Sequence, residues 1–171
     1  VSLALEPGAS RYAQLLKDFA AQGTLVALDP NIRPFYATPG HRAFLADLLP
    51  HVTLLKLSDE EVEFLGDDLI SQVPVVIVTR GGEGLSVQAG GLSLNVPAAQ
   101  VPVTDTIGAG DTIMAALLTQ IDERGLDSSA LAQLGAAEWK ELLSFAAAAA
   151  GLTVSRKGAN PPRREEVESS L

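Results

Sequence analysis

The chain has 171 residues, of which 47% are hydrophobic and 19% are charged, a composition typical of a soluble globular domain. Its net charge is -9 and its 12 Lys and Arg residues are scattered, which argues against a nucleic-acid partner. The sequence has no cysteine, which excludes disulfides, thiol catalysis and Cys-ligated zinc, and its two histidines accompany no nucleophile motif of a Ser/His/Asp triad.

The sequence contains no recognisable targeting or anchoring segment. The longest apolar run, FAAAAAGLTV from Phe145, is too short to cross a bilayer, and no charged-then-apolar signal segment opens the chain. Together with the absence of cysteine, this leads us to expect a cytoplasmic protein without a membrane partner. The first residue is valine rather than methionine, which suggests that the natural N-terminus is missing.

Helices and apolar strands alternate through the first 79 residues. The spacing of apolar residues predicts, in chain order, a helix over 12–21, a strand over 24–30, a helix over 41–50, a strand over 52–57 and a strand over 73–79. Before the last of these strands, Ser58 and Glu61 have the spacing of a capping box and predict a helix over 58–65. The strand at 73–79 is almost wholly β-branched, as expected for one covered on both faces.

The second half of the chain no longer alternates helices with strands. Two alternating runs over 84–97, joined by Gly90 and Gly91, predict a β-hairpin. Helices follow over 112–122 and 139–150, and a charged tail, expected to be exposed, closes the chain. The alternation of helices and strands favours a single α/β domain with a mostly parallel central sheet.

Polar residues follow each of the first three strands, where open α/β sheets bind ligands. Arg33, in D-P-N-I-R from Asp29, offers a planar guanidinium to a phosphate or a sugar, or is a solvated surface arginine. Glu61, in K-L-S-D-E-E, completes a helix cap, or also holds Mg²⁺ through water. The glycines of T-R-G-G-E-G, from Thr79 to Gly84, bring backbone donors to a phosphate, or form a turn.

The stretch D-T-I-G-A-G-D is the most specific of these segments. We expect Asp111 to be a buried carboxylate at the mouth of a helix and to act as general base toward a substrate hydroxyl. The N–H groups of Gly108, Ala109 and Gly110 would then stabilise negative charge passing between phosphoryl donor and acceptor. A plain helix start explains the acid but leaves the Gly-Ala-Gly sequence unexplained.

Five motifs of the chain occur in the order found in one known family. They are D-P-N-I-R-P, K-L-S-D-E-E, V-T-R-G-G-E-G, D-T-I-G-A-G-D-T-I-M-A-A-L-L and S-R-K-G-A-N-P-P. The chain thereby resembles the ribokinase-like sugar kinases, the PfkB carbohydrate kinase family. The resemblance implies a three-layer α/β/α fold, of which residues 1–171 would be only the C-terminal, nucleotide-binding and catalytic part of a single domain. The N-terminal sugar-binding and lid part would be absent.

The resemblance also implies roles for individual residues. Asp111 would be the catalytic base, and the anion hole would be formed by Gly108, Ala109 and Gly110. The nucleotide would be bound by Ser58, Glu61, Thr79, Gly81, Gly84 and Ala147, where Ser58 replaces the asparagine of the family's N-x-x-E motif. The substrate or its phosphate would be approached by Asp29, Asn31 and Arg33.

Metal ions enter through the same resemblance. Glu61 would hold Mg²⁺ through water. A monovalent cation, K⁺, would lie beside the anion hole near Asp105, Ile107 and Gly158.

Within the family, the motifs D-P-N-x-R-P, K-L-S-D-E-E and R-K-G-A-N-P-P are most similar to those of fructokinases. They imply that ATP phosphorylates fructose to fructose 6-phosphate, with 2-keto-3-deoxygluconate kinase and ribokinase as alternatives. The partners would be a small sugar and ATP, and the full-length protein would be a candidate homodimer. The isolated chain would be an inert nucleotide-binding module, because the residues that grip the sugar would lie outside it.

Overall fold

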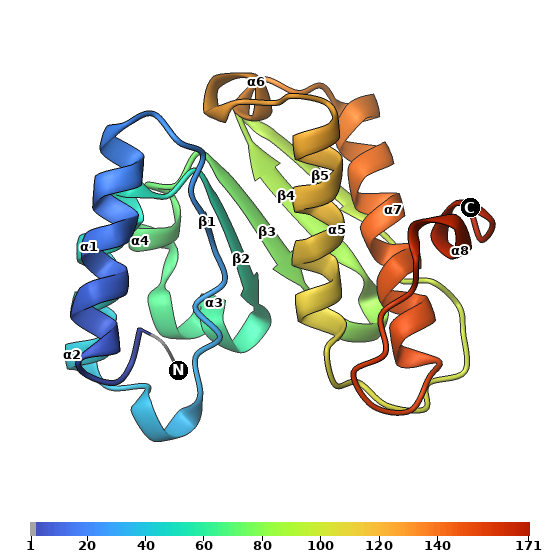
Figure 1. The fold of residues 1–171 in the computed structure, drawn as a ribbon, viewed down its shortest axis with the longest axis horizontal. Coiled ribbons are helices and arrows are strands. Elements are labelled where there is room, and N and C mark those ends of the chain that lie inside the picture. Colours follow the sequence, from blue (N-terminus) through green and yellow to red (C-terminus); the bar gives the residue numbers. More distant parts are fainter. Residues whose placement is uncertain (1–2) are drawn as a thin grey trace.

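The computed structural model describes residues 3–171 and contains one five-stranded sheet (Figure 1). The strands, in chain order, are β1 (Ala27–Leu28), β2 (Leu54–Ser58), β3 (Val75–Thr79), β4 (Leu85–Ala89) and β5 (Leu92–Val96). They lie in the same order across the sheet. The pairs β1/β2 and β2/β3 are parallel, and the pairs β3/β4 and β4/β5 are antiparallel.

Helices connect and cover these strands. The α-helices are α1 (Gly8–Ala21), α2 (Pro39–Leu48), α3 (Asp59–Leu65), α4 (Asp67–Ile70), α5 (Ala109–Glu123), α6 (Ser128–Ala132), α7 (Ala136–Val154) and α8 (Arg164–Glu168). Three short 3₁₀ helices are η1 (Pro34–Tyr36), η2 (Leu49–His51) and η3 (Gly81–Glu83). Among residues 3–171, no helix is both long enough and apolar enough to span a membrane.

Successive residues of β2 and β3 face opposite sides of the sheet and belong to two separate apolar cores. Leu54 and Ile77 pack in the core beneath α5 and α7, whereas Leu55 and Val76 pack in the core beneath α1 to α4. Figure 1 shows these helices on opposite faces of the sheet. The fold is therefore the three-layer α/β/α arrangement that the resemblance implies, and its strands β2 and β3 are buried on both faces.

Several local predictions are confirmed. The capping box at the start of α3 forms, with Ser58 accepting from the Glu61 amide and Glu61 accepting from the Ser58 amide. The hairpin between β4 and β5 turns at Gly90 and Gly91, both of which have positive φ. Together these two features fix the start of α3 and the antiparallel edge of the sheet.

Other boundaries differ from the prediction. The strand expected over 24–30 is reduced to the two residues of β1, and it ends before Pro30, which cannot donate a hydrogen bond to a ladder. The helix expected from Thr112 already begins at Ala109. The charged tail is exposed as expected, but it forms the helix α8, and its Val167 is buried beside α7.

Candidate active site

The first turn of α5 carries the Gly-Ala-Gly-Asp sequence. Gly108 is the N-cap in a left-handed conformation with φ 81°, and Ala109, Gly110 and Asp111 follow as helical residues. The Ala109 amide donates to the Thr106 carbonyl at 3.3 Å. Within residues 3–171, the amides of Gly110 and Asp111 have no hydrogen-bond partner. Two free donors at the positive end of a helix dipole form a site suited to an anion.

Asp111 is exposed, which corrects the expectation of a buried carboxylate. The reason is its position as the third residue of α5, because the neighbouring residues Thr112 and Ile113 are the ones that turn toward the core. Asp111 instead lines a polar cleft of about 980 Å³ at the carboxyl ends of the parallel strands. An acid on the wall of a cleft is accessible to a substrate hydroxyl.

The polar cleft brings together most of the predicted site residues. They come from the segments that follow β1, β2 and β3 and from the start of α5. The predicted residues that line it are Asp29, Asn31, Arg33, Ser58, Glu61, Thr79, Ile107, Gly108, Gly110 and Asp111. Polar residues that follow separate strands therefore line one cleft at the carboxyl ends of these strands.

Glu61 joins two of these segments. The Ile32 amide donates to its Oε1 at 2.6 Å, and the Ser58 amide donates to its Oε2 at 2.8 Å. The residue is 7% exposed, and its carboxylate anchors the loop after β1 to the start of α3. Each oxygen accepts one amide and retains a lone pair for a further donor or a hydrated ion.

Arg33 and Asn31 lie in the loop that Glu61 anchors. Arg33 is exposed and is the N-cap of η1, and its side chain makes no hydrogen bond or ion pair among the described residues. Asn31 has a positive φ of 49° and its carbonyl accepts from the Tyr36 hydroxyl. The loop is therefore held at its backbone, while the guanidinium stays free beside the cleft.

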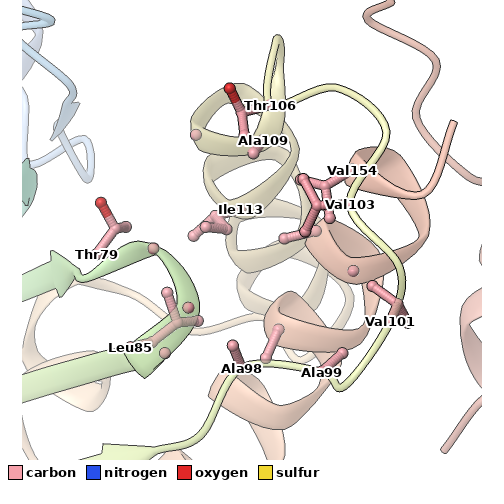
Figure 2. Close-up of a pocket in the computed structure, with 17 residues that line it drawn as sticks. Thr79, Leu85, Ala98, Ala99, Val101, Val103, Thr106, Ala109, Ile113 and Val154 are labelled. Atoms are coloured by element: carbon pink, nitrogen blue, oxygen red, sulfur yellow. The ribbon is translucent and has the colours of Figure 1, made fainter. Parts of the chain in front are cut away.

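A second cavity, of about 230 Å³, lies between the β3–β4 turn, the segment after β5 and helices α5 and α7. Figure 2 shows its walls, which are made mostly of small apolar side chains such as Ala98 and Val101. Of the predicted nucleotide-binding residues, this apolar cavity is lined by Thr79, Gly81, Gly84 and Ala147, together with Ala109 and Gly110. A cavity whose walls are largely apolar suits an aromatic base.

The glycine at position 84 is required by close packing. Its φ is 105°, and a Cβ placed there would come within 2.1 Å of the Val96 carbonyl oxygen. A Cβ placed on the neighbouring Gly82 would meet open space.

The hydroxyl of Thr79, at the end of β3, donates to the Leu57 carbonyl at 3.2 Å. This hydrogen bond fixes the orientation of the Thr79 side chain.

The two cavities adjoin at one place. Thr79, Thr106 and Gly110 line both the apolar cavity and the polar cleft. The first turn of α5 therefore separates a slot for a flat apolar group from a cleft that contains an acid and a free arginine. This is the geometry expected of a site that transfers a charged group from one molecule to another.

Asp105 connects the segment before α5 to the segment after α7. Its Oδ1 accepts from the Ile107 amide at 3.0 Å, and its Oδ2 accepts from the Gly158 amide at 2.9 Å. The Ile107 amide, followed by that of Gly158, lowers the pKa of Asp105 below its usual value of 3.8. These are the three residues predicted near a monovalent cation, and the structure places them in contact.

Among residues 3–171 there is no cluster of three His, Asp or Glu side chains suited to a metal.

Lys56 is a site residue that the sequence reasoning missed. It lines the polar cleft, and its Nζ lies 2.8 Å from Asp29 Oδ2. The available signal was a lysine inside the otherwise apolar strand segment V-T-L-L-K-L. A charged residue in a strand covered on both faces needs a reason, since lysine is rarely buried without a partner.

Comparison with known proteins identifies the family. A profile of the pfkB family of carbohydrate kinases matches residues 3–166. The chain belongs to the pfkB family of carbohydrate kinases. It is 30% identical over 182 aligned positions to probable fructokinase-3 of Arabidopsis thaliana, a match that covers 99% of this chain and 51% of that protein.

Two solved structures of pfkB-like fold resemble the chain over almost its whole length. Fructokinase with bound ATP from Xylella fastidiosa has a TM-score of 0.88 and 25% identity, and the match covers 98% of this chain and 58% of that one. A fructokinase double mutant from Vibrio cholerae O395, bound to fructose, ADP and potassium ion, has a TM-score of 0.83 and 25% identity, with 99% and 57% covered. The chain spans about half the length of the relatives that it matches.

Proposed function

We propose that residues 1–171 form the C-terminal, nucleotide-binding and catalytic part of an ATP-dependent sugar kinase that phosphorylates fructose to fructose 6-phosphate. One observation carries this proposal: the apolar cavity and the polar cleft adjoin at Gly110, in the first turn of α5. An adenine in the apolar cavity would direct its phosphates to the free amides of that turn. A sugar in the polar cleft would then have its hydroxyl beside Asp111.

The proposed step is an in-line phosphoryl transfer. A lone pair of the sugar hydroxyl oxygen forms the new bond to the γ-phosphorus of ATP, and the bond from that phosphorus to the bridging oxygen of ADP breaks. The hydroxyl proton moves to the Asp111 carboxylate, which lines the cleft. The amides of Gly110 and Asp111 take the negative charge that spreads over the transferred group.

Arg33 and Glu61, which line the same cleft, are proposed to assist the transfer. Arg33 is exposed and free of ion pairs among the described residues, so its guanidinium is available to the transferred phosphate or the sugar. The carboxylate of Glu61 is buried and retains lone pairs, which fits an Mg²⁺ ion bound through water and substrate phosphates. Bound there, Mg²⁺ would neutralise charge on the nucleotide phosphates.

A monovalent cation is proposed beside the same turn. Asp105, Ile107 and Gly158 lie together there, and the Asp105 carboxylate is held by two amides. The Vibrio cholerae fructokinase structure contains a potassium ion. Dependence of the activity of this protein on K⁺ would support this part of the proposal.

Fructose is favoured as the sugar because the relatives above are fructokinases and one of their structures holds fructose. The test is a panel of fructose, ribose and 2-keto-3-deoxygluconate offered with ATP and Mg²⁺ to the intact protein that contains this chain. We expect ADP release to be fastest with fructose and the product to be fructose 6-phosphate by mass and NMR. Faster turnover of another sugar would reassign the substrate, and no ADP release with any of the three would contradict the proposal.

A further inference from the structure

Lys56 is 4% exposed and is the one Lys or Arg among residues 3–171 that is buried. It belongs to β2, where Leu55 and Leu57 point into the core beneath α1 to α4. Because side chains alternate along a strand, Lys56 points the other way, toward α5. This places a buried cation beneath the helix start that carries Gly110 and Asp111.

Two contacts fix the position of the ammonium group. Lys56 Nζ lies 2.8 Å from Asp29 Oδ2, and a Cβ placed on Gly110 would come within 3.3 Å of the same nitrogen. Asp29 is the one hydrogen-bonding or ion-pair partner of Nζ among the described residues. An ammonium has three N–H donors, so two of them remain available on the side of the polar cleft that Lys56 lines.

Stability does not account for this arrangement. Removing a lysine from water is costly, and a buried ion pair contributes little net stability compared with apolar residues of the same size. Lys56 also lies at the N-terminal end of α5, where the helix dipole is positive and repels another positive charge. Asp29 balances the charge of the Lys56 ammonium, but the free amides of Gly110 and Asp111 still leave an excess of positive potential. A bound anion would relieve that excess.

We propose that Lys56 is a charge-stabilising residue of phosphoryl transfer, with Asp29 as its positioning residue. The ammonium supplies positive charge beneath the Gly110 and Asp111 amides, and Asp29 holds it there. This inference rests on the proposed kinase function and adds no bond-making or bond-breaking step. Lys56 stays protonated throughout, because the hydroxyl proton goes to Asp111.

The kinetic test compares Lys56→Met, Asp29→Asn and the double variant in the intact protein. The double variant removes both charges, so we expect its Tm to stay close to that of the unmodified protein. Its kcat should fall by about 10²-fold to 10³-fold, the range seen when one charge-stabilising group is lost, while KM for the sugar changes little. Lys140→Met, at an exposed position of α7, is the matched control and should leave kcat unchanged. A double variant with nearly normal kcat would show that the pair is only structural.

Inorganic phosphate provides a readout that does not depend on turnover. Added phosphate should raise the Tm of the unmodified protein, and tighter binding gives a larger increase. The increase in Tm should be at most half as large in the double variant. Lys56→Gln keeps N–H donors without the charge and serves as a second uncharged variant if the double variant does not fold. An equal rise in all variants, or none in the unmodified protein, would overturn the role of Lys56. A rise that depends on Lys56 in a protein that phosphorylates no sugar would show that Lys56 binds phosphate and would refute the kinase proposal.

Discussion

The Ile32 amide donates a 2.6 Å hydrogen bond to the Glu61 carboxylate, which links the loop after β1 to the first turn of α3. Replacing Glu61 by Gln removes one of its two oxygen acceptors, so either Ile32 or Ser58 loses its partner. We expect the free energy of unfolding to fall by about 1–3 kcal/mol. KM should rise as well, because the loop carries Arg33.

Chemical denaturation and steady-state kinetics on the same preparation check this prediction. Glu63→Gln is the matched control, because Glu63 is an exposed residue of the same helix. If the Glu61 variant is as stable as that control, the bond to Ile32 contributes nothing to the fold.

Replacing Asp111 by Asn should lower kcat by about 10²-fold or more, because an amide cannot accept the hydroxyl proton. Asp111 is exposed, so stability should change by less than about 0.5 kcal/mol. KM for ATP should remain similar, since the backbone amides of the turn are kept. Asp122→Asn, on the exposed side of the same helix, is the control for a simple loss of charge. Normal turnover in the Asp111 variant would refute its role as general base.

Two glycines of one turn should respond differently to the same substitution. Gly84→Ala places a Cβ 2.1 Å from the Val96 carbonyl oxygen at a φ of 105°, so the turn must distort at a cost of about 3 kcal/mol or more. Gly82→Ala meets open space and should be nearly neutral. Thermal unfolding with and without ATP checks both, and the Gly84 variant should also bind ATP less tightly because Gly84 lines the apolar cavity. Equal Tm values would contradict the close approach at Gly84.

The buried hydroxyls of Thr112 and Thr153 lie 3.0 Å apart and join α5 to α7. The Thr153 hydroxyl also donates to the Ala149 carbonyl at 3.1 Å, so its oxygen is the acceptor for Thr112. Thr153→Val should lose about 1 kcal/mol of stability because it leaves the Thr112 hydroxyl unpaired, and Thr112→Val should lose less because the Thr153 hydroxyl still donates to Ala149.

The double variant of Thr112 and Thr153 should lose less stability than the sum of the two single variants. In it both polar atoms are replaced by apolar groups of the same shape, so neither is left unpaired. A double-mutant cycle by chemical denaturation measures this coupling. Strictly additive losses would mean that the two hydroxyls do not interact.

Features that depend on neighbours in the sequence were predictable from it, and features that depend on distant neighbours were not. The Ser58 and Glu61 cap is encoded within four residues, and the hairpin that turns at Gly90 and Gly91 is encoded within one short segment, 84–97. The second use of the Glu61 carboxylate depends on Ile32, which only the sheet brings near. The distance between Lys56 and Gly110 likewise follows from helix–sheet packing, which periodicity alone does not specify.

The two amide bonds to Asp105 should make stability depend on pH in the acid range. These bonds lower the pKa of Asp105 in the folded state below its usual value of 3.8. The stabilisation is therefore fully present above that usual value and is lost as the pH falls through the lower, folded-state pKa. Asp105→Asn should accordingly have a lower Tm than the unmodified protein at pH 7, and the difference should narrow in acid.

Thermal unfolding between about pH 7 and pH 2 follows the difference for Asp105→Asn, and an NMR titration of its carboxyl carbon measures the pKa directly. Asp67→Asn is the control, because Asp67 is exposed and its side chain makes no hydrogen bond among the described residues. The Asp105 carboxylate accepts from the Gly158 amide and so joins it to the segment before α5, and if the proposed K⁺ site lies there, any stimulation by K⁺ should weaken in the variant. A Tm difference that stays constant down to pH 2 would mean that the two amides do not favour the charged carboxylate.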